Sequence, residues 1–224
     1  MQTVSTIKGE LRQSNVIERL FVKKSFWIIF WLVAFSYPLI QSINRKLPDP
    51  LPVYGVVPSF NLETEDSLRI KSDDLKGKIY IANFMFASCP TSCPKNLKTI
   101  KKIQKRIRGV GQKIAILSFT VDPENDTPKK LFKLARDWKA NPFIWKFITG
   151  KKENLFPLLT DGFKVPMGDK EYSKNVYDIA HSQKVVLVDQ KGQIRGYYSL
   201  DKNDINKLMI DVGLLANDAF TTKG

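Results

Sequence analysis

The feature that most limits the possible folds is a nearly continuous apolar run, KIYIANFMF at 78–86, which follows a break at Gly77. Such a run is typical of a parallel strand that is covered on both faces. Pro94 then begins a stretch whose apolar residues recur at helical spacing, and proline is well suited to a first helical turn. The sequence therefore predicts a buried strand, a short loop that contains Cys89, and a helix with Cys93 at its N-terminus.

Further apolar segments alternate along the chain. KIAILSFTV at 113–121 predicts a second buried strand, and Thr127 and Pro128 suit the cap and first position of a helix that reaches about Trp138. We next expect a strand at 143–148 and a helix at 151–160. A hairpin of strands 184–189 and 194–199 around QKGQ follows, and a last helix is expected at 202–216. A parallel crossover and a terminal hairpin must share one core, so the sequence predicts an α/β sandwich with a mixed sheet.

The composition fits one globular domain with an appendage, since the chain has 224 residues, 43% of them hydrophobic and 26% charged. Its formal net charge of +14 could support binding to nucleic acid, binding to an anionic membrane surface, or only solubility. Lysines are spread along the chain, with local density only at 95–108 and 129–139, and neither run contains a recognisable nucleic-acid motif. We expect no nucleic-acid binding and interpret these runs as solvated helix faces or as a surface for an acidic partner protein.

Residues 26–43 form an uncharged segment of about the length that spans a bilayer as a helix. Two lysines precede it, with two arginines farther upstream, while Arg45 and Lys46 follow, so the excess of positive charge on its N-terminal side is modest. No small-x-small cleavage site follows the apolar part. We expect a single-pass, uncleaved signal anchor in the inner cell membrane, with the soluble domain on the outer, periplasmic side. The alternative is a buried helix, because Pro38 and a short apolar core weaken the prediction.

This anchor divides the chain into five parts. Residues 1–25 are expected to be a cytoplasmic segment, and residues 26–43 the transmembrane anchor. The prolines of LPDPLP predict a stiff linker at 44–52. We expect the compact domain at 53–217 and a C-terminal tail at 218–224.

Cys89 and Cys93 are the only cysteines in the chain, too few for a disulfide-stapled framework. If Cys93 lies on the first helical turn, both sulfurs can converge at the helix N-terminus, where a partial positive charge favours thiolate over thiol. The pair could then form a disulfide or share a metal ion. The other interpretation is two unrelated buried cysteines.

His181 is the only histidine, and we expect it in a loop just ahead of the strand at 184–189. A lone histidine is more often a solvated or core residue than a ligand. Two thiolates and one imidazole would make a soft donor set that suits Cu(I), and a weak oxygen ligand or water could support Cu(II). Zinc also accepts two cysteines and a histidine, so the residues alone leave the metal open.

Three segments in this order, NFMFASCPTSCP, FTVDPENDTP and AHSQKVVLVDQKGQIRGYY, resemble the Sco/SenC family of copper chaperones for cytochrome c oxidase assembly over roughly 55–215. The resemblance implies a thioredoxin-like three-layer sandwich in which Cys89, Cys93 and His181 bind copper. It also implies that the two cysteines can form a disulfide instead. Asp122 is similar in position to an acidic residue near the site, although a turn or capping role is the alternative.

Two departures from the family pattern concern the surroundings of the site and not the three ligands. The family commonly has threonine where this chain has Ala87, and aspartate where it has Ala180. Such changes put the tuning of the metal by neighbouring groups in doubt.

The resemblance implies that the protein delivers copper to the binuclear copper centre of a cytochrome c oxidase subunit, or exchanges it with another copper chaperone. The alternative is a thiol-disulfide oxidoreductase that keeps the cysteines of such a subunit reduced. The three-residue spacer argues mildly against that enzyme, because a two-residue spacer is the usual thioredoxin motif. Whether the protein is also an enzyme is left open by the sequence.

Overall fold

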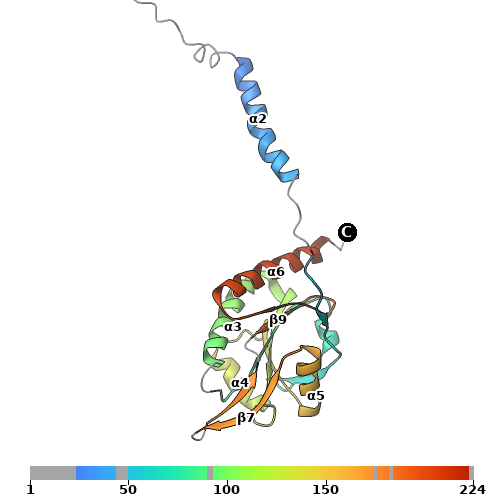
Figure 1. Ribbon diagram of the computed structural model, residues 1–224, viewed down its shortest axis with the longest axis vertical. Helices are drawn as coiled ribbons and strands as arrows, with labels where there is room; N and C mark the ends of the chain where they lie inside the picture. The colour runs from blue at the N-terminus through green and yellow to red at the C-terminus, as the bar shows by residue number, and fades with distance from the viewer. Residues whose placement is uncertain (1–23, 44–49, 90–92, 174–175, 182–183, 222–224) are drawn as a thin grey trace, which may run out of the picture. The chain divides into compact units, whose positions relative to one another are not determined.

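The computed structural model describes residues 24–43, 50–89, 93–173, 176–181 and 184–221 (Figure 1). The chain divides into two compact units, Met1–Pro50 and Leu51–Gly224. In the first unit, helix α2 (Lys24–Ile43) contains Pro38, and its large apolar side chains are mostly exposed. The helix predicted here is present, but the transmembrane span predicted for 26–43 is not supported. Within the described part of the chain, no helix is both long and apolar enough to cross a membrane.

The second unit is built on a mixed sheet of eight strands. The strands lie in the order β1-β10-β9-β4-β5-β6-β2-β3, and the central β4, β5 and β6 are parallel, while β9 runs antiparallel to β4. The bounds are β1 (Gly55–Val56), β2 (Asn61–Thr64), β3 (Arg69–Lys71), β4 (Ile79–Met85), β5 (Ile114–Thr120), β6 (Trp145–Thr149), β9 (Val185–Val188) and β10 (Gln193–Tyr198). Every residue of β4 is buried, as expected for a central strand covered on both faces.

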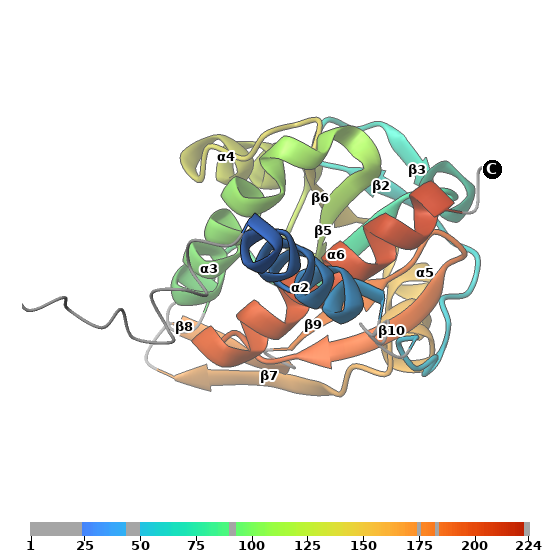
Figure 2. The ribbon, with the colours of Figure 1, turned by 90° about the horizontal axis from the view of Figure 1, so that it is seen from above.

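Helices cover the sheet. Their bounds are α3 (Cys93–Ile107), α4 (Pro128–Asp137), α5 (Lys152–Pro157) and α6 (Lys202–Thr221), with the shorter helices η1 (Ser72–Leu75), η2 (Arg108–Lys113) and η3 (Leu158–Gly162). Because the β4-α3-β5 and β5-α4-β6 crossovers move along the sheet in one direction, right-handed connections place α3 and α4 on the same face. Arg106 of α3 bonds Asn206 of α6 at 3.1 Å, which adds α6 to this layer (Figure 2).

Aromatic side chains fill part of the core against the sheet. The ring of Phe163, which follows η3, lies 5.6 Å from that of Phe84 on β4 and 5.2 Å from that of Phe119 on β5, measured between centroids. A polar chain also crosses the three parallel strands. The indole nitrogen of Trp145 donates to the Ser118 hydroxyl, which donates to the Asn83 amide oxygen, both at 2.7 Å. These buried polar groups are stable because each has a hydrogen-bond partner.

The predicted mixed α/β fold is confirmed, with three local differences. The helix expected at 151–160 is divided, because α5 ends at Pro157 and the chain continues as the wider π-turns of η3. The strands β1, β2 and β3 were not predicted. Nor was a separate antiparallel pair, β7 (Met167–Ser173) and β8 (Val176–His181). His181 is therefore the last residue of a strand, and the loop predicted for it was wrong, because two polar segments without a strong apolar pattern pair with each other.

Candidate metal and redox site

Cys89 lies where the central strand β4 leads toward helix α3. Its backbone N–H donates to the carbonyl of Phe86 at 3.3 Å, and the residue is only 8% exposed. Cys93 is the first residue of α3, so the predicted sequence of strand, cysteine loop and helix N-terminus is confirmed. The side chain of Cys93 lies outside the described residues, and so does the sulfur-to-sulfur distance.

His181 ends β8 and faces Met167 of β7 in the register of that strand pair. Its side chain also lies outside the described residues. Among the side chains that the structure describes, no group of three or more His, Cys, Asp or Glu residues could hold a metal ion. The ligand set Cys89, Cys93 and His181 therefore stays a prediction.

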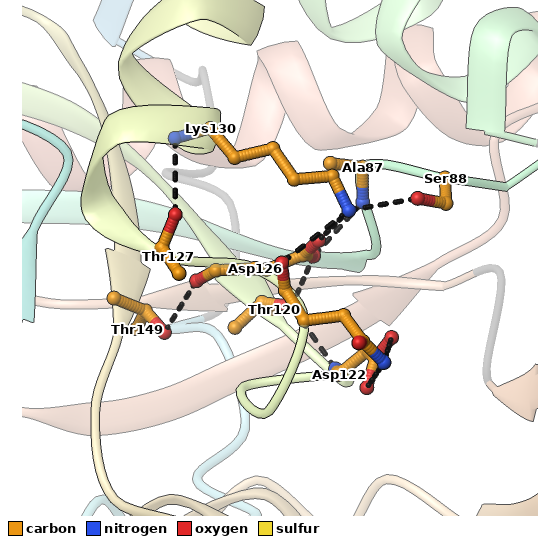
Figure 3. A network of polar contacts seen from close by, with 9 residues as sticks. Ala87, Ser88, Thr120, Asp122, Asp126, Thr127, Lys130 and Thr149 are labelled. Atoms are coloured by element: carbon orange, nitrogen blue, oxygen red, sulfur yellow. Dashed lines mark hydrogen bonds and ion pairs between the residues drawn. The ribbon is translucent and has the colours of Figure 1, made fainter.

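A buried carboxylate fixes the chain just ahead of Cys89 (Figure 3). Asp126 is 0% exposed, and its Oδ2 accepts hydrogen bonds from the Ala87 backbone N–H at 2.8 Å and from the Thr120 hydroxyl at 2.6 Å. The backbone contact joins residues 39 positions apart. A hydrogen bond to an ionised acceptor is stronger than one between neutral groups, so Asp126 restrains the residue two positions before the cysteine.

A lysine supplies the second contact to the same loop. The ammonium of Lys130, on the first turn of α4, lies 3.1 Å from Asp126 Oδ1 and donates to the Ser88 hydroxyl at 2.7 Å. Oδ1 makes no hydrogen bond among the described residues, so this ion pair is its compensating contact. Asp126 and Lys130 together hold the two residues that precede Cys89 against α4 and β5.

The loop from β5 to α4 places Asp126 at this point. Its backbone N–H donates to the Asp122 carbonyl at 2.9 Å, and its own carbonyl accepts from the Thr149 hydroxyl at 3.0 Å. Thr127 then caps α4 by accepting the Lys130 backbone N–H at 3.3 Å. Sequence reasoning missed Asp126. The signal was an aspartate directly before a Thr-Pro helix start, but nothing local showed that its side chain would turn toward the cysteine loop.

Asp122, the acidic residue predicted near the site, is 1% exposed and organises the same turn. Its carboxylate accepts from the Asn125 side-chain amide at 2.9 and 3.2 Å, and its backbone N–H donates to the Thr120 hydroxyl at 3.0 Å. These contacts fit the turn-forming role that was the alternative for this residue. Its role beside a metal stays a prediction.

Known proteins resemble this chain across most of its length. The SCO1/SenC family model matches residues 49–212. The SCO1 protein homolog of Bacillus subtilis (strain 168) is 29% identical over 171 residues, which cover 75% of this chain and 86% of that protein.

Two solved structures share the fold of the second unit. BsSco, a member of the Sco family of cytochrome c oxidase assembly proteins in which a disulfide switch was identified, gives a TM-score of 0.64 at 26% identity, over 77% of this chain and 99% of that one. ScoI of Bradyrhizobium japonicum with copper bound gives a TM-score of 0.62 at 21% identity, over 71% of this chain and 99% of that one. These matches confirm the predicted thioredoxin-like, mixed α/β fold.

Proposed function

Because the chain belongs to the SCO1/SenC family, we propose that it binds copper through Cys89, Cys93 and His181 and takes part in the assembly of cytochrome c oxidase. The observation that supports this most is the position of the cysteines, one buried beyond the end of β4 and the other at the start of α3. A helix N-terminus favours the thiolate, which is the form that binds a metal. A relative with the same fold has been solved with copper bound.

The chemistry of the donor set fits copper. Two thiolates and one imidazole are soft donors that suit Cu(I), and such a site can release its ion to an acceptor with similar donors. A buried Cys89 keeps one donor away from bulk water, while Asp126 holds the preceding residues in place. We infer that the bound ion is handed to the binuclear copper centre of an oxidase subunit, or passes between this protein and another copper chaperone.

A second candidate is a thiol-disulfide oxidoreductase that reduces the cysteines of the same subunit. It is favoured by the disulfide switch identified in BsSco, which is 26% identical to this chain. In that reaction a Cys89 or Cys93 thiolate attacks a disulfide of the partner, forming a mixed disulfide and releasing one partner thiolate. The other cysteine then displaces the second partner thiolate and closes the disulfide within this protein. The two functions exclude each other at any moment, because a disulfide sulfur is no longer a thiolate donor.

We also propose that α2 attaches the protein to a membrane. The side chains of Ile28, Leu32 and Phe35 are 61%, 66% and 69% exposed, and contiguous apolar surface of this kind marks a membrane or protein contact. The single-pass topology, with the domain on the periplasmic side of the inner membrane, stays a prediction. Replacing Leu32 and Phe35 by Asp should move the protein from the membrane pellet to the soluble fraction, and an unchanged distribution would contradict the attachment.

The test of the site is an anaerobic Cu(I) titration of the reduced full-length protein beside His181→Ala. The variant should retain much less copper after desalting yet keep thiol-disulfide exchange, since a dithiol exchanger needs no imidazole. Thr99→Ala, which removes a solvent-exposed hydroxyl from the half-buried Thr99 of α3, is a control that should leave both activities unchanged. Full copper retention by His181→Ala would refute the ligand set. A wild-type protein that exchanges thiols but binds no copper would favour the oxidoreductase.

A further inference from the structure

The positive charge of the second unit is concentrated in two segments of the chain. Residues 95–113 contain eight Lys and Arg and no Asp or Glu, and residues 127–139 contain five Lys and Arg against one Asp. Elsewhere in Leu51–Gly224 there are 16 Lys and Arg and 18 Asp and Glu, so the remainder is slightly acidic. The excess positive charge is therefore a local property of α3, η2 and α4, and general solubility does not require such an arrangement.

The fold brings these two segments side by side. The side-chain amide of Gln104 on α3 donates to the Lys139 carbonyl at 3.5 Å and accepts from the Asn141 backbone N–H at 2.7 Å. Figure 2 shows α3 and α4 as neighbours on one side of the sheet. Their exposed cations recur at spacings of three and four residues, which places them on one face of each helix. We call this the basic surface, and it consists of Lys95, Lys98, Lys102, Lys105 and Arg106 of α3 and Lys129, Lys133 and Arg136 of α4.

Two features distinguish the basic surface from an ordinary solvated helix face. Among the described residues, none of its eight cations forms an ion pair, so no ion pair there offsets their mutual repulsion. Phe132 of α4 is 46% exposed and, by helical spacing, lies beside Lys129 and Arg136. Aromatic residues and arginine are enriched at protein-protein interfaces, so an exposed aromatic ring beside an arginine suits a protein contact.

The basic surface reaches the cysteine loop. α3 begins at Cys93, and Lys130 on the first turn of α4 donates to the Ser88 hydroxyl at 2.7 Å. α4 therefore begins beside Ser88, the residue before Cys89, and α3 begins with Cys93 itself. A protein that docks along the two helices would have part of its surface next to this loop, as transfer of an ion or of electrons between thiols requires.

We propose that the basic surface docks an acidic protein partner and brings it to the cysteine loop, an inference that rests on the proposed function. Opposite charges on the two proteins accelerate their encounter by a factor of about 10 to 1,000 at low salt, and the gain falls as ionic strength rises. The apolar ring of Phe132 acts on the lifetime of the complex, because truncating a buried anchor changes mainly the dissociation rate. The partner is the protein that accepts copper or electrons from this chain.

The experiment uses the full chain and, as probe, the purified apo copper-binding domain of the oxidase subunit. Lys98→Glu, Lys102→Glu and Lys133→Glu are combined in one surface variant. The matched control combines Lys71→Glu, Lys151→Glu and Lys191→Glu, three exposed lysines outside the basic surface, so that both variants have the same net charge. Association is measured by biolayer interferometry at low and high salt, and copper affinity and copper transfer are measured separately.

The surface variant should associate about tenfold more slowly at low salt, with unchanged copper affinity, and the difference from wild type should shrink at high salt. The control should associate at close to the wild-type rate, and Phe132→Ala should dissociate faster with little change in association. Equal slowing in both charge variants, or wild-type association by the surface variant, would overturn the inference. The inference would also be overturned if the surface variant lost binding to phosphatidylglycerol vesicles but still bound the protein domain like wild type. The basic surface would then be a membrane contact. If wild type binds the domain through this surface but transfers no copper, the delivery function fails and the docking surface stands.

Discussion

Asp126→Asn tests whether the carboxylate is needed to hold the cysteine loop. The substitution keeps the shape of the side chain, and the asparagine oxygen can still accept from the Ala87 N–H and the Thr120 hydroxyl, which lie 2.8 and 2.6 Å from Oδ2 in the wild type. The asparagine NH2 group then replaces Oδ1, which lies 3.1 Å from the Lys130 ammonium. Two hydrogen-bond donors would face each other where the wild type has an ion pair.

The expected cost follows from these contacts. A hydrogen bond to a charged group contributes about 1.5–3 kcal/mol and one between neutral groups about 0.5–1.5 kcal/mol, so two weakened bonds lose about 2 kcal/mol. The ion pair adds less than about 1 kcal/mol, because the Lys130 side chain is 37% exposed and its charge is partly screened. We expect the free energy of unfolding to fall by about 2–3 kcal/mol, and Tm to fall by about 5–10 °C for a protein of this size.

The assay is urea unfolding of the full-length protein followed by tryptophan fluorescence, to which the buried Trp145 contributes. Copper affinity is the second readout, because groups that orient metal ligands typically change it by about 10–100-fold. Asp137→Asn, at an exposed position on α4, is the matched control and should change neither quantity. If Asp126→Asn lowered the free energy of unfolding by less than about 0.5 kcal/mol and left the copper affinity unchanged, the positioning role of Asp126 would be refuted.

Three further outcomes are expected. Ser118→Ala should lower the free energy of unfolding by about 3 kcal/mol in urea denaturation, because it removes the acceptor of the buried Trp145 N–H and the donor to the Asn83 amide oxygen. Burial raises the pKa of Glu65 above its ordinary value of 4.5, so the folded protein binds this proton more tightly and stability falls as pH rises from 4.5 through the raised pKa. Glu65→Gln should remove that loss, seen as a smaller stability difference between pH 4 and pH 7. Oxidising Cys89 and Cys93 to a disulfide should abolish copper retention, measured by metal analysis, and reduction should restore it.

Each of these three expectations can be contradicted by a specific result. Thr99→Ala removes an exposed hydroxyl that bonds the Lys95 carbonyl and should be close to neutral, so an equal loss in Ser118→Ala would contradict the argument from burial. For Glu65→Gln, the glutamine oxygen still accepts the Phe147 N–H that bonds the wild-type carboxylate at 2.8 Å. An unchanged pH dependence would show that another group produces it. Copper bound stoichiometrically by the oxidised protein would mean that the thiolates are not the donors.

The sequence by itself determined the elements whose signals are local. The apolar runs at 78–86 and 113–121 became β4 and β5, because a strand buried on both faces requires an unbroken apolar segment. Thr127 and Pro128 became the cap and first turn of α4, since both act within one helical turn. The position of Cys89 and Cys93 between a strand and a helix followed from the same patterns.

Only the tertiary structure decided which distant residues meet. The contact of Asp126 with Ala87 spans 39 positions and depends on how β5 and its loop lie beside β4, which no local pattern encodes. The pairing of β7 with β8, which makes His181 the end of a strand, joins segments that are close in the sequence, but neither segment has the apolar pattern that would have predicted a strand. The basic surface arises because parallel crossovers of one hand place α3 and α4 on the same face of the sheet, so that two lysine-rich segments separated in the sequence become neighbours.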